Sequence, residues 1–123
     1  MDKKILIIED EPDIREAIAE ALTDAGFIVF SAENGEVGVE KALAEKPDVI
    51  LLDIVMPVLD GHAALKKIRQ DSWGQSVKVI MLTSMDDVHN VGDAHELNIT
   101  DYLIKPHSSL AEIVKKVREY AVT

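Results

Sequence analysis

The sequence contains no cysteine, which excludes disulfide bonds and thiolate metal sites. It also lacks any apolar run near the roughly 20 residues that a membrane-spanning helix needs. The apolar run at 5–8 is short and is followed at once by acidic residues, unlike a secretory signal peptide. Basic residues are scarce: 13 Lys and Arg stand against 23 Asp and Glu, and the net charge of −10 disfavours contact with nucleic acid. We therefore expect a cytoplasmic protein that contacts no membrane and does not bind nucleic acid directly.

The length of the chain limits how many domains it can form. A chain of 123 residues can build one sizeable hydrophobic core but not two. Hydrophobic residues make up 47% of it and charged residues 29%, which is typical of a globular protein. Because no linker, repeat or low-complexity tract interrupts the chain, we expect a single domain over residues 1–123.

The segment Val49–Leu52 consists of four large aliphatic residues and ends at the carboxylate Asp53. It is too short for a helix and too uniformly apolar for a strand with one solvated face, so it favours a strand that is covered on both faces. Such strands belong to parallel sheets, in which ligands bind beyond the carboxyl ends of the strands. Asp53 is therefore the first candidate for a functional residue.

Strand-like and helix-like segments alternate along the whole chain. We expect strands at 4–8, 27–30, 49–53, 77–82 and 102–104. Helices are expected at 14–25, 34–46, 61–70 and 86–97, and a last one starts at 108 or 109. The alternation predicts a doubly wound α/β fold, in which a five-stranded parallel sheet carries five helices on its two faces.

Local signals add detail to these elements. Gly26 is expected to end the first helix in a left-handed conformation. Periodicity places Leu43 and Leu110 on the apolar faces of their helices and Arg15 on a solvated face. Trp73, in the loop after the third helix, is expected to cap the core at its surface.

The expected strand ends bring chemically active side chains to one edge of the sheet. Glu9, Asp10 and Asp53 would repel one another there unless a cation compensates their charge, and Mg²⁺ is suited to carboxylate ligands. Thr83 and Lys105 offer a hydroxyl and a point charge to the oxygens of a phosphoryl group. Asp53 can then act as a nucleophile that forms an acyl phosphate.

Five motifs give the chain a resemblance to a known family. They are Ile7-Ile8-Glu9-Asp10-Glu11, Leu51-Leu52-Asp53-Ile54-Val55-Met56-Pro57, Asp60-Gly61, Leu82-Thr83-Ser84 and Tyr102-Leu103-Ile104-Lys105-Pro106. Over its whole length the chain resembles the receiver domain of two-component response regulators, which has a CheY-like, flavodoxin-like fold. The resemblance implies a signalling switch that catalyses its own phosphorylation and dephosphorylation but is not a turnover enzyme.

The resemblance also implies a role for each matching position. Glu9, Asp10, Asp53 and the main-chain carbonyl of Val55 would bind Mg²⁺, and Asp53 would accept the phosphoryl group. The donor would be a sensor histidine kinase, a phosphotransfer protein or a small phosphodonor. The output would pass to a downstream protein or a fused effector domain.

Further positions would respond to the phosphoryl group. Thr83 and Lys105 would bind its oxygens, and Tyr102 would turn inward as Thr83 moves. The bond before Pro106 would be cis, as it is in the family. Asp60 is expected to be a turn residue and not a ligand.

Some positions depart from the family pattern. Asn98-Ile99 replaces a common Gly-Ala pair, and His107 replaces an aromatic residue. Val55 and Met85 are apolar where the family often has polar residues beside the path of an attacking water. Since neither side chain can orient that water, we expect a long-lived aspartyl phosphate.

Three other functions fit the sequence less well than the switch does. An aspartate-nucleophile phosphohydrolase would need a second acid two positions after Asp53 and additional length for a substrate cap. The sequence has neither. A flavin-binding protein would need a phosphate-binding loop after the first strand. This chain has acidic residues there, which would repel a phosphate. An inactive receiver used as a scaffold is disfavoured because every catalytic position is filled.

Overall fold

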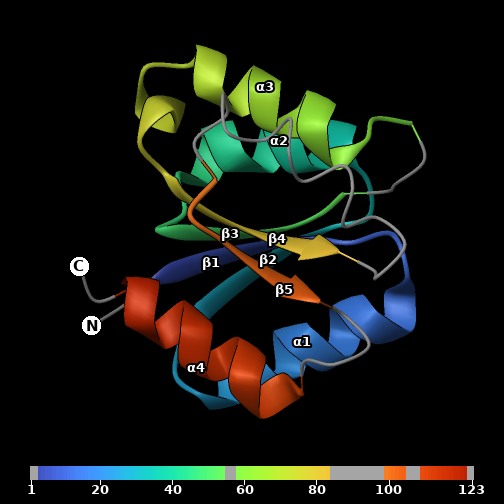
Figure 1. Cartoon of the computed structure of the whole chain (residues 1–123), viewed down its shortest axis with the longest axis vertical. Coiled ribbons are helices and arrows are strands. Elements are labelled where there is room, and N and C mark those ends of the chain that lie inside the picture. The colour runs from blue at the N-terminus through green and yellow to red at the C-terminus, as the bar shows by residue number, and fades with distance from the viewer. Residues whose placement is uncertain (1–2, 55–57, 84–98, 105–108, 122–123) are drawn as a thin grey trace.

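Five parallel strands form one sheet in the computed structural model, which describes residues 3–54, 58–83, 99–104 and 109–121, with Thr83 described by its backbone alone. The strands are β1 (Lys4–Ile8), β2 (Ile28–Ala32), β3 (Val49–Asp53), β4 (Lys78–Thr83) and β5 (Asp101–Ile104). Their order in the sheet is β2-β1-β3-β4-β5, and every neighbouring pair is parallel. The predicted five-stranded parallel sheet is confirmed (Figure 1).

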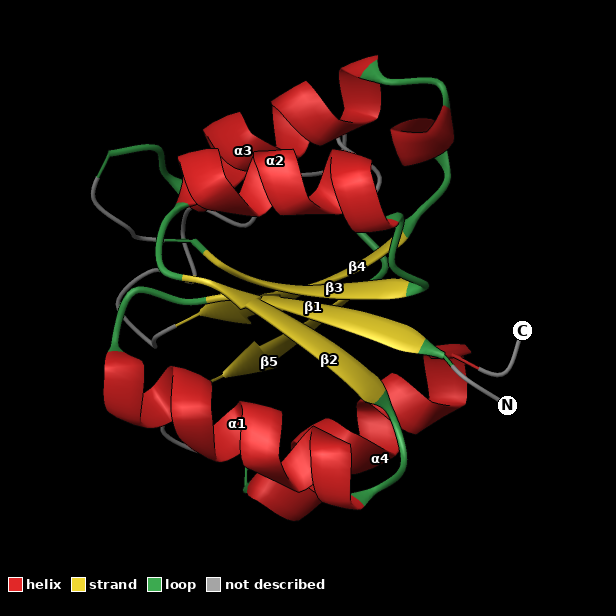
Figure 2. Ribbon diagram, turned by 180° about the vertical axis from the view of Figure 1, so that it is seen from behind, coloured by secondary structure: helices red, strands yellow, loops and turns green. Residues whose placement is uncertain are grey.

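Helices cover both faces of this sheet. They are α1 (Pro12–Asp24), α2 (Gly35–Glu45), α3 (Gly61–Gln70) and α4 (Leu110–Ala121), with a short 3₁₀ turn, η1 (Trp73–Gln75). Figures 1 and 2 show α1 and α4 on one face and α2 and α3 on the other. The helix expected at 86–97 lies outside the described residues, so α4 corresponds to the last helix of the prediction. None of the helices within the described ranges is long and apolar enough to cross a bilayer.

Two hydrophobic clusters, one on each side of the sheet, make up the core. Because successive strand residues face opposite sides, each central strand contributes to both clusters. The cluster beneath α2 and α3 includes Leu6, Ile8, Ile50, Leu52, Val79 and Met81. The cluster beneath α1 and α4 includes Ile5, Ile7, Val49, Leu51, Ile80 and Leu82. All four residues of Val49–Leu52 are fully buried, as the uniformly apolar sequence predicted.

Several predicted helix ends are confirmed. Pro12 occupies the first turn of α1, and Gly26 follows that helix with φ of 101°. The Asn34 side chain accepts a hydrogen bond from the Val37 amide and so caps α2. Trp73 is half-buried and packs against the core, although its segment forms a 3₁₀ turn and not an irregular loop.

The predictions for Leu43 and Leu110 were wrong, since these side chains are 37% and 44% exposed. In α2 the sheet-facing positions belong to small residues, and a Cβ on Gly38 would lie 2.5 Å from Ile8 Cδ1. The helix therefore lies too close to β1 to place a leucine there. Leu110 is the first residue of α4, where the helix is only beginning to cross the sheet.

Candidate functional site

Glu9 and Asp53 leave the sheet from neighbouring strands. In the pairing of β1 with β3, Ile8 lies opposite Leu52, so the next residue of each strand is an acid at the same level of the sheet. This adjacency follows from the strand order, which places β1 directly beside β3. The two acids therefore meet at the carboxyl edge of the sheet, as the sequence predicted.

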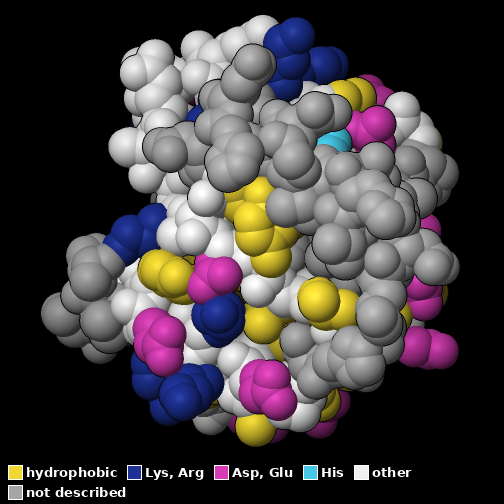
Figure 3. Space-filling model, in the orientation of Figure 1, with side chains coloured by type: hydrophobic (Ala, Val, Ile, Leu, Met, Phe, Trp, Pro, Cys, Tyr) yellow, Lys and Arg dark blue, Asp and Glu magenta, His cyan; other side chains and the backbone are white. Residues whose placement is uncertain are grey.

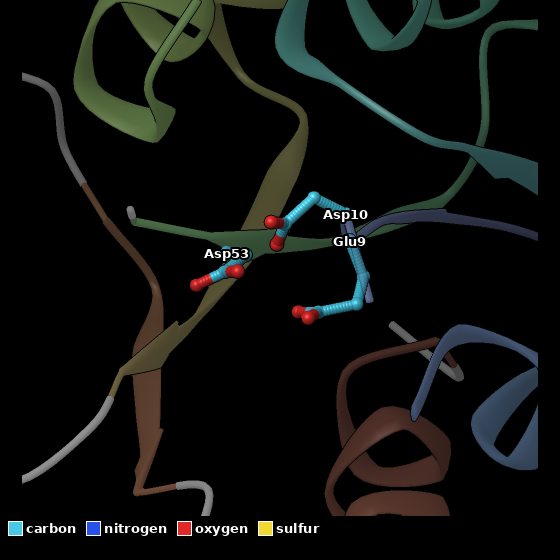
Figure 4. Close-up of side chains that lie close together, drawn as sticks. All are labelled: Glu9, Asp10 and Asp53. Carbon is cyan, nitrogen blue, oxygen red and sulfur yellow. The ribbon is translucent and has the colours of Figure 1, made fainter. Parts of the chain in front are cut away.

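Glu9, Asp10 and Asp53 form a cluster that we call the acidic triad. One carboxylate oxygen of each residue lies within 4.8 Å of the corresponding oxygens of the other two. Figure 4 shows the three side chains extending into the same space beyond the strand ends. Glu9 is fully buried and Asp53 is 4% exposed, whereas Asp10 is partly exposed. Two of the three carboxylates are thus removed from bulk water.

The loop after Asp53 is held close to the sheet by Gly61, the first residue of α3. The Gly61 amide donates to the carbonyl of Ile54 at 2.8 Å. A Cβ at Gly61 would lie 2.3 Å from the Asp53 carbonyl oxygen, so only glycine allows this approach. Asp60 accepts a hydrogen bond from the Ala63 amide and caps α3, which fits its predicted place in a turn.

The acidic triad fits a hard divalent cation. Three carboxylates in this space repel one another, and burial strengthens the repulsion, so a compensating cation is chemically favoured. Oxygen ligands of this kind suit Mg²⁺, which commonly takes one or two carboxylates and retains waters. The donor set of the described residues therefore agrees with the predicted magnesium site.

Tyr102 lies in β5, paired with Met81 of β4. Its ring is half-buried against the core cluster beneath α2 and α3, and this burial raises the pKa of its phenol. The inward packing is compatible with the predicted switch, whose movement stays a prediction.

Among the other predicted site positions, only the backbone of Thr83 falls within the described residues. The backbone of Thr83 ends β4 one residue after Leu82, which pairs with Asp53. The remaining predicted positions lie outside the described residues. They are Val55, Ser84, Met85, Lys105, the Lys105-Pro106 bond and His107.

Arg15 is a residue that sequence reasoning assigned wrongly. It was placed on a solvated face of the first helix, but the side chain is half-buried. Its Nη1 atom donates to the Glu9 carbonyl at 2.9 Å and approaches the Asp10 carbonyl at 3.4 Å. The available signal was its position one turn into a helix that directly follows two candidate ligands.

A second polar cluster joins β5 to α4. The Asp101 carboxylate accepts hydrogen bonds from Lys116 Nζ at 2.8 Å and from the Tyr120 hydroxyl at 2.7 Å. Burial alone would raise the pKa of Asp101, but these two donors and the Tyr102 amide outweigh it and hold the pKa below its usual range. Figure 3 shows charged side chains of both signs over α4, which is typical of a solvated helix face.

Comparisons with known proteins agree with this geometry. The response regulator receiver domain family model matches residues 5–118. The chain is 41% identical over 106 residues to a probable transcriptional regulator, ycf27, of Guillardia theta. The matched region covers 86% of this chain and 41% of that protein. It is 38% identical over 115 residues to the transcriptional activator IrlR of Burkholderia pseudomallei, covering 94% of this chain and 48% of that one. The chain thus spans less than half the length of either regulator.

Solved structures of similar size show the same fold. Chemotaxis protein CheY4 of Vibrio cholerae superimposes with a TM-score of 0.90 at 28% identity, covering 98% of this chain and 99% of that one. The receiver domain of sensor histidine kinase PA1611 of Pseudomonas aeruginosa, solved with magnesium in its active site cleft, gives 0.88 at 29% identity and covers both chains fully. The chain belongs to the receiver domain family of two-component response regulators, whose members are signalling switches.

Proposed function

We propose that Asp53 accepts a phosphoryl group in the presence of Mg²⁺ and that this phosphorylation switches the partner-binding surface of the domain. The observation that carries the proposal is the acidic triad, in which Asp53 ends a buried central strand beside Glu9 and Asp10. A carboxylate held there lies at the carboxyl edge of the sheet, where ligands of parallel sheets bind, and has two further carboxylates beside it that suit a cation.

The chemistry assigns one task to each residue. An Asp53 carboxylate oxygen attacks the phosphorus of the donor, the bond from phosphorus to the donor breaks, and an acyl phosphate forms. Asp53, Glu9, Asp10 and the Val55 carbonyl would hold the Mg²⁺, which would supply positive charge for the phosphoryl oxygens. Thr83 and Lys105 hold those oxygens by a hydroxyl hydrogen bond and a point charge.

The family and the similar regulators support the partners that we propose. The donor is a sensor histidine kinase or a phosphotransfer protein, because an aspartyl phosphate needs an activated phosphoryl source. Relatives such as IrlR are named as transcriptional activators and extend well beyond the matched region. Output through a fused effector domain or a separate downstream protein fits that architecture, and the net charge of −10 argues against direct nucleic-acid contact by this chain.

Acetyl phosphate with Mg²⁺ tests the proposal by mass spectrometry of the intact protein. The wild type is expected to gain the mass of one phosphoryl group, and Asp53→Asn is expected to gain none. Asp60→Asn is the matched control: it removes a carboxylate from the same loop, and asparagine caps a helix as well as aspartate does. An equal adduct on Asp53→Asn would contradict the assignment. Continuous hydrolysis of small phosphomonoesters would instead indicate a phosphohydrolase.

A further inference from the structure

The Arg15 guanidinium reaches back from α1 to the loop that carries two acids of the triad. Arg15 lies in the first turn of the helix, where its amide donates to the Glu11 carbonyl at 2.9 Å. Helical side chains point toward the helix N-terminus, so this position directs the guanidinium at the preceding loop. There it meets the carbonyls of Glu9 at 2.9 Å and of Asp10 at 3.4 Å.

The oxygen atoms that accept from Arg15 determine its effect on the acidic triad. Within the described part of the chain, both hydrogen bonds of the guanidinium go to main-chain oxygens and not to carboxylates. Arg15 therefore holds the backbone of Glu9 and Asp10 without occupying either carboxylate. Both contacts are made by one nitrogen, Nη1, whose N–H directions are fixed in the plane of the guanidinium.

The loop needs this support at Asp10 more than at Glu9. The Glu9 amide already donates to the Ala32 carbonyl of β2 at 3.1 Å, which anchors the first acid to the sheet. Asp10 follows the end of β1, where pairing with the neighbouring strands has ended. The Arg15 contact with its carbonyl extends the anchoring by one residue, to the acid that is partly exposed.

We infer that Arg15 is a positioning residue, which presets the Glu9 and Asp10 carboxylates for the divalent cation by holding their main-chain carbonyls. The inference rests on the proposed function, because it concerns the metal site of that function. It assigns no contact between Arg15 and the phosphoryl group.

The sign of the effect separates positioning from simple electrostatics. Arg15→Met removes a positive charge near three carboxylates, and by Coulomb's law alone this should strengthen cation binding. Positioning predicts the opposite, since a loop that is no longer held must be ordered when the cation binds. Loss of a group that orients metal ligands typically weakens metal affinity about tenfold or more.

Titration calorimetry with Mg²⁺ alone tests the inference on the full chain. Arg15→Met is expected to bind Mg²⁺ about tenfold more weakly than the wild type. Arg15→Lys keeps the charge but has a different reach and lacks the fixed N–H directions of the guanidinium, so it is expected to fall between them or to match Arg15→Met. In the absence of Mg²⁺, amide hydrogen exchange at residues 9–11 should be faster in Arg15→Met.

Arg69 provides a matched control. Its Nη1 atom also donates to two carbonyls, those of Gly74 and Val77, each at 2.7 Å. This clamp lies at the end of α3 and the start of β4, at the opposite edge of the sheet from the acidic triad. Arg69→Met is expected to lower the melting temperature and to leave Mg²⁺ affinity at the wild-type value.

The Mg²⁺ dependence of phosphorylation by acetyl phosphate completes the test. In Arg15→Met the half-saturating Mg²⁺ concentration should rise about tenfold, with a much smaller loss of the rate at saturation. A merely structural role would lower that rate without shifting the concentration. The inference is overturned by that result, by unchanged or tighter Mg²⁺ binding in Arg15→Met, or by wild-type affinity in Arg15→Lys. If the wild type itself binds no Mg²⁺ and forms no adduct, the proposed function fails, whatever the variants do.

Discussion

At the scale of single residues, Val58 holds a main-chain conformation that its side chain disfavours. Its φ is 71°, in the left-handed region, and its side chain is 73% exposed. A β-branched residue is a genuine outlier there, and the exposed side chain has little packing to offset the cost. The residue lies between Asp53 and the capped start of α3, so strain is stored in the loop that borders the proposed site.

Val58→Asn should therefore stabilise the protein. Asparagine tolerates the left-handed region, and we expect the free energy of unfolding to rise by about 1 kcal/mol. Val58→Gly should gain less, because glycine loses more backbone entropy on folding. Urea unfolding of both variants measures the difference, with Val58→Ala as the control that keeps a Cβ at this position. A less stable Val58→Asn would show that the valine side chain makes contacts worth more than the strain.

The acids of the site were predictable from sequence, and Arg15 was not. Glu9 and Asp53 each end an apolar run, so strand geometry alone places them at the carboxyl edge of a parallel sheet. Helical periodicity separates core-facing from outward-facing positions, and it assigned Arg15 to the second group. Periodicity does not show that an outward-facing side chain in the first turn of a helix contacts the preceding loop and not solvent. That depends on the path of the loop, which no residue pattern specifies.

At the scale of elements, the Asp101 cluster links the edge strand β5 to α4. Lys116 and Tyr120 both donate to the same carboxylate, and each has a raised pKa whose largest cause is this hydrogen bond to Asp101. The Asp101 pKa is lowered, so its contribution to stability is present above the ordinary aspartate pKa and is lost as the pH falls through the folded-state value. The Lys116 contribution is present below the ordinary lysine pKa and is lost as the pH rises through its raised value.

Asp101→Asn is expected to lower the free energy of unfolding by about 1 kcal/mol at neutral pH. The difference from the wild type should hold across the range from about pH 4 to about pH 10 and shrink beyond both ends. Urea unfolding at acid, neutral and alkaline pH measures it. Tyr120→Phe, which removes one donor and keeps the ion pair, should show a smaller loss. A difference that is equally large in strong acid would mean that the Asp101 charge contributes nothing.

The positions of strands and helices could be predicted from the sequence better than which of their side chains face the core. All five strands lie close to their predicted positions, because short apolar runs bounded by turn residues are a strong signal. The outward turn of Leu43 could not be foreseen, since hydrophobicity ranks leucine above glycine for the buried face. The structure reverses that ranking because Gly38 lets α2 approach Ile8 closely. Helix-to-sheet distance is a property of the packed pair and not of either sequence segment.

At the scale of the whole molecule, strand order creates the site. The alternation of strands and helices predicts a parallel sheet, but it does not state which strands are neighbours. In the order β2-β1-β3-β4-β5 the chain changes winding direction between β1 and β3, and ligands of such sheets bind at that switch point. The acidic triad lies there. The sequence pattern predicts the shared edge of the sheet, and the strand order adds the adjacency of β1 and β3 that brings the acids together.

The same topology forces the fold to hold three mutually repelling carboxylates, and this has a consequence for global stability. Within the described residues, Asp53 and Glu9 are buried and one oxygen of each lies within 4.8 Å of the Asp10 carboxylate. In EDTA, Asp53→Asn should therefore be more stable than the wild type, by about 1 kcal/mol or more. Mg²⁺ should raise the wild-type melting temperature in a concentration-dependent way, because it binds the folded state.

Thermal unfolding of both proteins in EDTA and in excess Mg²⁺ measures the two effects together. Mg²⁺ should stabilise Asp53→Asn much less than the wild type. The difference in stability between the two proteins should therefore shrink or change sign when the metal is added. Asp60→Asn should follow the wild type in both conditions, since Asp60 caps α3 and lies outside the triad. If Asp53→Asn were instead less stable in EDTA and responded fully to Mg²⁺, the carboxylates would not be repelling one another. The triad would then be an ordinary set of loop acids, and the cation would have to bind elsewhere.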